Sequence, residues 1–184
     1  SKINNYILAV GFFKNTAGIA FLDISTGSFR VCESQDTKKV LDEVLRIGPS
    51  EVLLPESLKN EGFSLRLAEA VAGVSFSFIP DRCFEYGRSR ERLLEQFNTV
   101  SLEGFGCEKM KAGVGAAGAV VHYVRETQKQ EVAHVSTIKP YMLNQFLFVD
   151  DLSCGNLELI KNIRTGDRQG TLLSRSEEHT SELQ

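Results

Sequence analysis

The chain has 184 residues, of which 42% are hydrophobic and 24% are charged, as in a globular protein with room for one domain and part of a second. Its formal net charge of −3 gives no electrostatic reason for this chain to bind nucleic acid by itself. No apolar run approaches the ~20 residues of a membrane-spanning helix, so the sequence gives no sign of membrane insertion.

The first part of the chain is predicted to form three strands. Residues 3–13 are apolar and aromatic, residues 17–24 form a second apolar run, and residues 28–32 alternate. Polar, glycine-containing connectors separate these runs and suit hairpins. We therefore expect an antiparallel meander.

The hydrophobic period then changes to that of helices. Residues 37–47 are predicted to form a helix with Asp36 or Thr37 as its cap and Gly48 as its end. A second helix is expected in 63–73. The expected apolar positions are Val40, Leu41, Val44, Leu45 and Ile47 in the first helix, and Leu65, Leu67, Ala68 and Val71 in the second.

Each of these helices is followed or preceded by a short strand. "SEVLLPES" reads as a buried strand ending at Pro55, and "VSFSFIPD" alternates as a strand does. The order is βββαβαβ, in which the helical crossovers favour parallel, right-handed connections. The predicted fold class is α/β, a mixed sheet flanked by helices.

The second half of the chain is predicted to be mainly helical. A short helix at 89–98 and a turn at 101–106 precede a long helix from 107 to about 130, with apolar residues recurring every three or four positions. A helix of that length spans roughly 30–35 Å and could run from one domain into the next. Beyond it we expect a strand-like run at Gln145–Val149 and a helix at Asn156–Ile163.

Gly113, Gly115 and Gly118 have the G-x-G-x-x-G spacing of a dinucleotide-binding loop. Such a loop must follow a buried strand and open a helix, but the residues before it here are charged and already in helical register. The glycines are therefore interpreted as small residues that permit close backbone packing. We predict no cofactor-binding residue.

The cysteines and histidines do not form a metal-binding or redox pattern. Cys32, Cys83, Cys107 and Cys154 are far apart with no C-x-x-C pair, which favours free thiols in a reducing cytoplasm. The three histidines, His122, His134 and His179, are isolated from one another. No metal ligand and no catalytic residue is predicted.

A metal-dependent nuclease is one alternative on this kind of sheet. Two-metal cleavage needs several carboxylates converging within ~4 Å of two cations. The first strand has no carboxylate. The remaining candidates are scattered at strand ends and in the later part of the chain: Asp23, Glu51, Glu56, Asp150 and Asp151.

A stand-alone protein-interaction domain is the other alternative. The stretch "EYGRSRERLLEQF" places Arg88, Arg90 and Arg92 among acidic residues on a predicted helix. These arginines could bind an acidic partner surface, although a solvated amphipathic helix has the same pattern.

The last ten residues, "RSEEHTSELQ" (175–184), match one reading frame of a common sequencing-library adapter throughout. They are set aside from fold reasoning as a translated artefact. The expectation is that the natural sequence stops at Ser174 within a longer protein, and that both ends of the chain are cut.

Five stretches, in order, resemble the MutS family of bacterial DNA mismatch-repair proteins. They are Gly18–Phe29, Pro49–Pro55, Ser101–Gly106, Ala116–Lys129, and Asn156–Leu173. The resemblance covers residues 1–174, and its specificity comes from the ordered set. One local departure is Gly155, where the family usually has an arginine before "NLEL".

The resemblance implies a connector domain over 1–134, including the long linking helix, and the N-terminal part of the all-α core or lever domain over 135–174. It implies a ribonuclease-H-like connector fold that relays state between DNA-binding and ATPase domains and offers part of a docking surface for a MutL-type matchmaker. The family protein is a dimeric, cytoplasmic ATPase that binds mismatched duplex DNA and uses ATP and Mg²⁺. No phosphate-binding G-x-x-x-x-G-K-[ST] motif occurs in these 184 residues, so the resemblance transfers no catalytic, nucleotide-binding or metal-binding residue and implies no enzyme activity for this piece.

Overall fold

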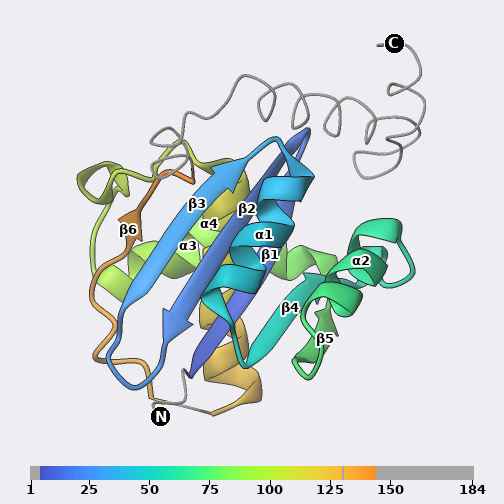
Figure 1. The fold of residues 1–184 in the computed structure, drawn as a ribbon. Coiled ribbons are helices and arrows are strands. Elements are labelled where there is room, and N and C mark those ends of the chain that lie inside the picture. Colours follow the sequence, from blue (N-terminus) through green and yellow to red (C-terminus); the bar gives the residue numbers. More distant parts are fainter. Residues whose placement is uncertain (1–4, 130, 144–184) are drawn as a thin grey trace.

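A single six-stranded sheet organises the molecule, with the strand order β5-β4-β1-β2-β3-β6 (Figure 1). The computed structural model describes residues 5–129 and 131–143. The strands are β1 (Tyr6–Phe13), β2 (Thr16–Asp23), β3 (Phe29–Ser34), β4 (Glu51–Pro55), β5 (Ser75–Ile79) and β6 (Lys139–Pro140). The predicted α/β class and βββαβαβ order are confirmed, and likeness to ribonuclease H stays a prediction.

Strand directions follow the lengths of the connections. β1, β2 and β3 form the predicted antiparallel meander, in which Phe13 pairs with Thr16 across a two-residue turn. Lys14 in that turn has a left-handed φ of 54°. β4 and β5 pair in parallel with β1 and β4 through helical crossovers, so the sheet is mixed.

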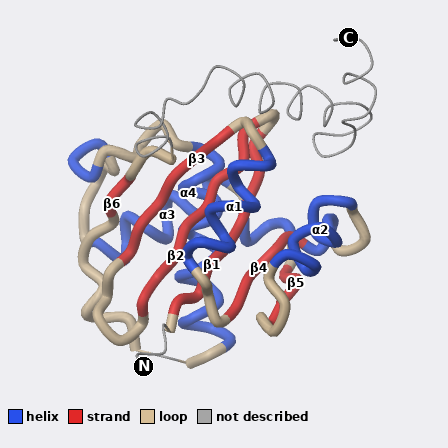
Figure 2. Tube along the Cα trace, viewed as in Figure 1, coloured by secondary structure: helices blue, strands red, loops and turns tan. Residues whose placement is uncertain are grey.

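Helices α1 (Thr37–Ile47) and α2 (Gly62–Ala70) cover one face of the sheet (Figures 1 and 2). Both predicted ends of α1 are confirmed. The Asp36 carboxylate accepts a hydrogen bond from the Lys38 amide, and Gly48 ends the helix in the left-handed conformation with φ 63°.

The predicted apolar stripes of these two helices were partly wrong. Leu45 and Leu65 are exposed, at 53% and 57% of their surface, and Ala68 is exposed as well. In α1 the buried apolar positions are 40, 44 and 47, and residue 45 lies about 100° further round the helix than residue 44. In α2, Phe63 and Leu67, one turn apart, pack against the sheet. Leu65 lies between them in sequence and points away from the sheet.

Helices α3 (Tyr86–Phe97) and α4 (Lys111–His122) cover the other face. α3 begins three residues earlier than predicted. The long helix predicted over 107–130 is shorter: residues 107–110 form a turn, and after His122 the chain continues as one wider π-helical segment, Tyr123–Thr127. Lys129, with a left-handed φ of 52°, lies beyond the helical segment.

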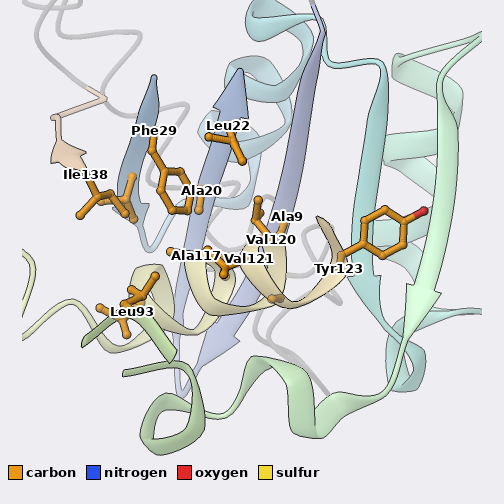
Figure 3. Close-up of a cluster of buried hydrophobic side chains, with 14 of the residues drawn as sticks. Ala9, Ala20, Leu22, Phe29, Leu93, Ala117, Val120, Val121, Tyr123 and Ile138 are labelled. Atoms are coloured by element: carbon orange, nitrogen blue, oxygen red, sulfur yellow. The ribbon is translucent and has the colours of Figure 1, made fainter. Parts of the chain in front are cut away.

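The glycines of α4 lie inside a buried helix, and no strand leads into them. A Cβ atom on Gly113 would lie 2.7 Å from Val31, one on Gly115 would overlap the Phe84 carbonyl, and one on Gly118 would overlap Ser89. The packing interpretation of this motif is confirmed. Figure 3 shows the resulting core, where Val120 and Val121 of α4 lie against Ala9 of β1.

The segment after α4 returns to the edge of β3. Val132, Val135 and Ile138 are buried in the core on the α4 side, and β6 pairs in parallel with β3. The sequence did not predict β6. The division into two domains at residue 134 stays a prediction, and the strand-like run at 145–149, the helix at 156–163, Cys154, Gly155, His179 and the tail lie outside the described residues.

Candidate interaction surface

The acidic residues considered for a nuclease site are separated by the sheet. Asp23 pairs with Tyr6, and Glu51 pairs with Ile7, so the two acids lie two strands, or about 10 Å, apart. They also point to opposite faces, because Tyr6 and Ile7 pack into different cores. Glu56 follows the opposite end of β4.

No group of three or more His, Cys, Asp or Glu side chains suited to a metal ion occurs within 5–129 and 131–143. Asp23 instead accepts hydrogen bonds from the backbone and hydroxyl of Ser25, the latter lowering its pKa. Asp150 and Asp151 lie outside the described residues. The geometry of the described acids therefore gives two-metal cleavage no ligand set.

Glu51 belongs to a polar cluster that the sequence did not reveal. Tyr123, at the start of the π-helical segment, donates its hydroxyl hydrogen to the Glu51 carboxylate, and Ser77 of β5 donates to the same oxygen at 2.7 Å. Gln128 donates to the Tyr123 hydroxyl at 3.1 Å. Burial, followed by the Glu51 hydrogen bond, raises the pKa of Tyr123. The cluster fixes the end of α4 on β4 and β5.

A second polar cluster joins α3 to the segment before α4. The Arg90 guanidinium donates two hydrogen bonds to Glu108, at 2.6 and 3.0 Å. Glu108 also accepts from the Ser101 hydroxyl at 3.1 Å and the Leu102 amide at 3.0 Å, and so holds the "SLEGFG" turn. The hydrogen bonds from Arg90 and then Leu102 lower the pKa of Glu108 to about 2.

The three arginines of α3 therefore have different surroundings. Arg88 is exposed and pairs with Glu85 at 3.0 Å. Arg90 forms the structural pair with Glu108. Arg92 is half-buried and donates to the Gly118 carbonyl at 3.2 Å, and burial lowers its pKa. α3 buries Ser89 and Leu93, and of its three arginines Arg88 is exposed whereas Arg90 and Arg92 are partly buried.

Several hollows adjoin α3, and two of them shape its outer surface. One, of about 510 Å³, lies where β1 and β4 end at the start of α3. Its walls are mainly aromatic or apolar, and its charged residues are Lys14, Glu61, Asp81 and Glu85. The apolar wall residues are Phe12, Phe13, Pro55, Leu58, Phe84 and Tyr86.

The other hollow, of about 920 Å³, lies between α3 and the π-helical segment. Arg88, Arg92 and Arg125 line it together with glutamates, and Val100 at its margin is 90% exposed. The outer surface of α3 and of the turn that follows it thus combines hollows, both signs of charge and the exposed Val100 side chain. These are features of a protein-docking surface.

The described histidines and cysteines lie where they contribute to the fold. His134 Nε2 lies 2.6 Å from the Ile24 carbonyl, and burial lowers the pKa of His122. Cys32, Cys83 and Cys107 are free thiols, as the sequence predicted. All three are also buried, and burial raises the pKa of each thiol. Among the residues described, no helix is both long and apolar enough to cross a bilayer.

The described residues form an α/β domain, and the sequence of this domain has known relatives. Residues 5–136 match the family model of MutS domain II. The chain is 44% identical over 178 residues to a protein named DNA mismatch repair protein MutS from Desulforapulum autotrophicum, a match that covers 94% of this chain and 20% of the relative.

Proteins of the same name from other bacteria are also similar. The identity is 42% over 170 residues for Desulfosudis oleivorans, covering 92% of this chain and 19% of the relative. It is 38% over 182 residues for Trichodesmium erythraeum, covering 95% and 20%. The chain belongs to the MutS family of DNA mismatch-repair proteins, and it spans about a fifth of the length of these relatives.

Proposed function

We propose that this chain is the connector of a MutS mismatch-repair ATPase, relaying conformational state between the DNA-binding and ATPase parts and contributing to the docking of a MutL-type matchmaker. The parent protein would be cytoplasmic and dimeric, and it would bind mismatched duplex DNA through other domains. ATP and Mg²⁺ would bind outside this chain, which has no phosphate-binding motif. The membership in the MutS family is the observation that supports the proposal most strongly.

The packing of α4 supports a relay role. A helix whose backbone touches a strand, a carbonyl and a second helix has no room to shift against them. Force applied at one end of such a body moves the whole body, which is the behaviour required for rigid-body transmission.

The exposed face of α3 supports the docking role. It carries Arg88 and the two hollows described above, whereas Arg90 is engaged in holding the fold. A charged residue at the rim of an interface contributes mainly to the rate and specificity of association. Arg88 is therefore the residue at which docking can be weakened without disturbing the core.

The experiment compares binding of a purified MutL-type protein to the 184-residue chain and to its Arg88→Glu variant. We expect the reversal to weaken binding about tenfold, equivalent to ~1.4 kcal/mol. Circular dichroism of both proteins checks that the fold is intact.

Lys38→Glu is the matched control. Lys38 forms an exposed helical ion pair with Asp42 at 3.0 Å, comparable to the Arg88–Glu85 pair, but on α1 at the opposite face of the sheet. We expect this variant to bind as the unmodified chain does. Equal binding by all three proteins would contradict docking at α3.

The proposal assigns no chemistry to this chain. A cleavage assay with single- and double-stranded DNA in the presence of Mg²⁺ or Mn²⁺ is expected to show no turnover. Turnover that copurifies with the chain, and that is lost in a Glu51→Gln variant, would favour the nuclease alternative instead.

A further inference from the structure

Residues 131–141, close to the end of the described part of the chain, form a strap along the edge of β3. In Figure 1 its orange end lies beside β3, far in sequence from that strand. The strap contacts both cores of the domain: Ile138 is buried on the α4 side, and Tyr141 packs on the α1 side. It therefore wraps around the sheet edge.

The first half of the strap is held by several independent contacts. The Gln96 side chain of α3 donates to the carbonyls of Val132 and Val135, at 2.7 and 2.9 Å. His134 contacts the Ile24 carbonyl. Val132, Val135 and Ile138 are all at least 92% buried, so this half is part of the core.

In the second half, residues 139–141, the side chain that packs against a core is that of Tyr141. Lys139 and Pro140 are exposed, and β6 has only these two residues. Tyr141 donates its amide hydrogen to the Val31 carbonyl at 2.9 Å and its hydroxyl hydrogen to the Glu43 carboxylate at 2.5 Å. Its ring packs edge-on against Phe21, with centroids 6.0 Å apart.

The Glu43 carboxylate, which accepts the hydrogen bond from the Tyr141 hydroxyl, is held in position by other contacts. Glu43 of α1 is largely buried, and it receives two hydrogen bonds from Arg46, at 2.9 and 2.5 Å. The Arg30 guanidinium lies 4.8 Å from the centre of the Tyr141 ring on the same face. The Glu43 carboxylate and the Arg30 guanidinium together form the binding site of the Tyr141 side chain.

We propose that the Tyr141–Glu43 contact is the lock of a strap whose terminal half, residues 139–141, opens from β3 as a unit separate from the sheet. Short paired segments with exposed backbone open locally at lower free energy than the strands of a core. When residues 139–141 open, the chain would leave the domain near Ile138 and no longer at Tyr141. The hydrogen bonds from Gln96 would still hold the first half of the strap in place. This device does not depend on docking at α3.

Hydrogen exchange in the 184-residue chain tests the lock. The amide of residue 141 is followed by NMR in the unmodified chain and in Tyr141→Phe, which keeps the ring and removes the hydroxyl. We expect this amide to exchange about tenfold faster or more in the variant, because a hydrogen bond to a charged group is lost. In the unmodified chain, the free energy of opening measured at this amide should already be lower than that measured at the amides of β1 and β2, because the strap opens without the sheet.

Tyr123→Phe is the matched control, since it removes a tyrosine–glutamate hydrogen bond at the other side of the sheet. It should leave the exchange of residue 141 unchanged. The proposal is overturned if Tyr141→Phe leaves that amide unchanged. It is also overturned if, in the unmodified chain, the amide of residue 141 has the same opening free energy as the amides of β1 and β2, because the strap would then open only with the whole fold.

Discussion

The two faces of the sheet are covered in different ways. On the α1 and α2 face, large side chains such as Phe63 and Leu67 fill the space between helix and strand. On the α4 face, glycines and alanines bring the helix backbone close to β2 and α3. The first arrangement derives stability from buried apolar area, and the second depends on close approach between backbones.

This difference indicates which changes each face tolerates. A face filled by large side chains is damaged when atoms are removed, because a cavity forms. A face built on close approach is damaged when atoms are added, because nothing can move aside. Substitutions of opposite kind therefore test the two faces.

Removal of a large side chain should have the largest effect. Leu67→Ala is expected to lower the free energy of unfolding by about 2–5 kcal/mol, because Leu67 is fully buried under α2. Urea unfolding of both proteins measures the change. Leu65→Ala is the control on the same helix, and its exposed side chain should cost under about 0.5 kcal/mol. Similar losses in both variants would contradict the assigned face of α2.

Addition of one methyl group should have the next largest effect. Gly118→Ala is expected to lower the free energy of unfolding by about 1–3 kcal/mol, because the new Cβ overlaps Ser89. Gly87→Ala, in α3, meets nothing within 4 Å and should be neutral or stabilising by up to about 1 kcal/mol. A tolerated alanine at 118 would show that α4 can shift, and would weaken the comparison between the faces.

Acid should affect the α4 side through Glu108. Its native pKa of about 2 lies below the ordinary value of 4.5, so its stabilising contribution is complete above about pH 4.5 and is lost as the pH falls toward 2. The melting temperature should therefore fall more between pH 6 and pH 3 in the unmodified chain than in Glu108→Gln.

Glu33 provides a control of opposite sign. Burial raises its pKa, so its protonation favours the folded state, and this contribution is lost as the pH rises through its native pKa. The unmodified chain should thus gain stability relative to Glu33→Gln on acidification. Equal slopes for the two glutamine variants would refute the assigned surroundings of both carboxylates.

Much of the fold was predictable because it follows local patterns. The meander, the two crossovers and both ends of α1 are encoded within short stretches, where alternation, capping by Asp36 and the left-handed Gly48 act independently of the rest of the chain. β6 was not predictable, since Lys139 and Pro140 have no strand pattern and are extended only because β3 offers an edge.

The candidate surface was less predictable than the fold. Arg88, Arg90 and Arg92 look alike in sequence, and only the three-dimensional position of Glu108, 18 residues after Arg90, separates the structural arginine from the exposed one. The glycines of α4 indicated close packing in the sequence, but the sequence did not indicate which residues they pack against. Leu45 and Leu65 fitted the apolar periodicity of a helix but are exposed. Which side of a helix is buried depends on the position of the sheet, and the helix sequence alone does not give that position.

The strap also shields the molecule from unwanted association. β3 would otherwise present unpaired backbone groups at the sheet margin, and such margins recruit strands from other molecules. The match to the MutS domain II model stops at residue 136, whereas the amide that donates to the Val31 carbonyl belongs to Tyr141. A few residues past the match to domain II thus help to cover this margin of the sheet.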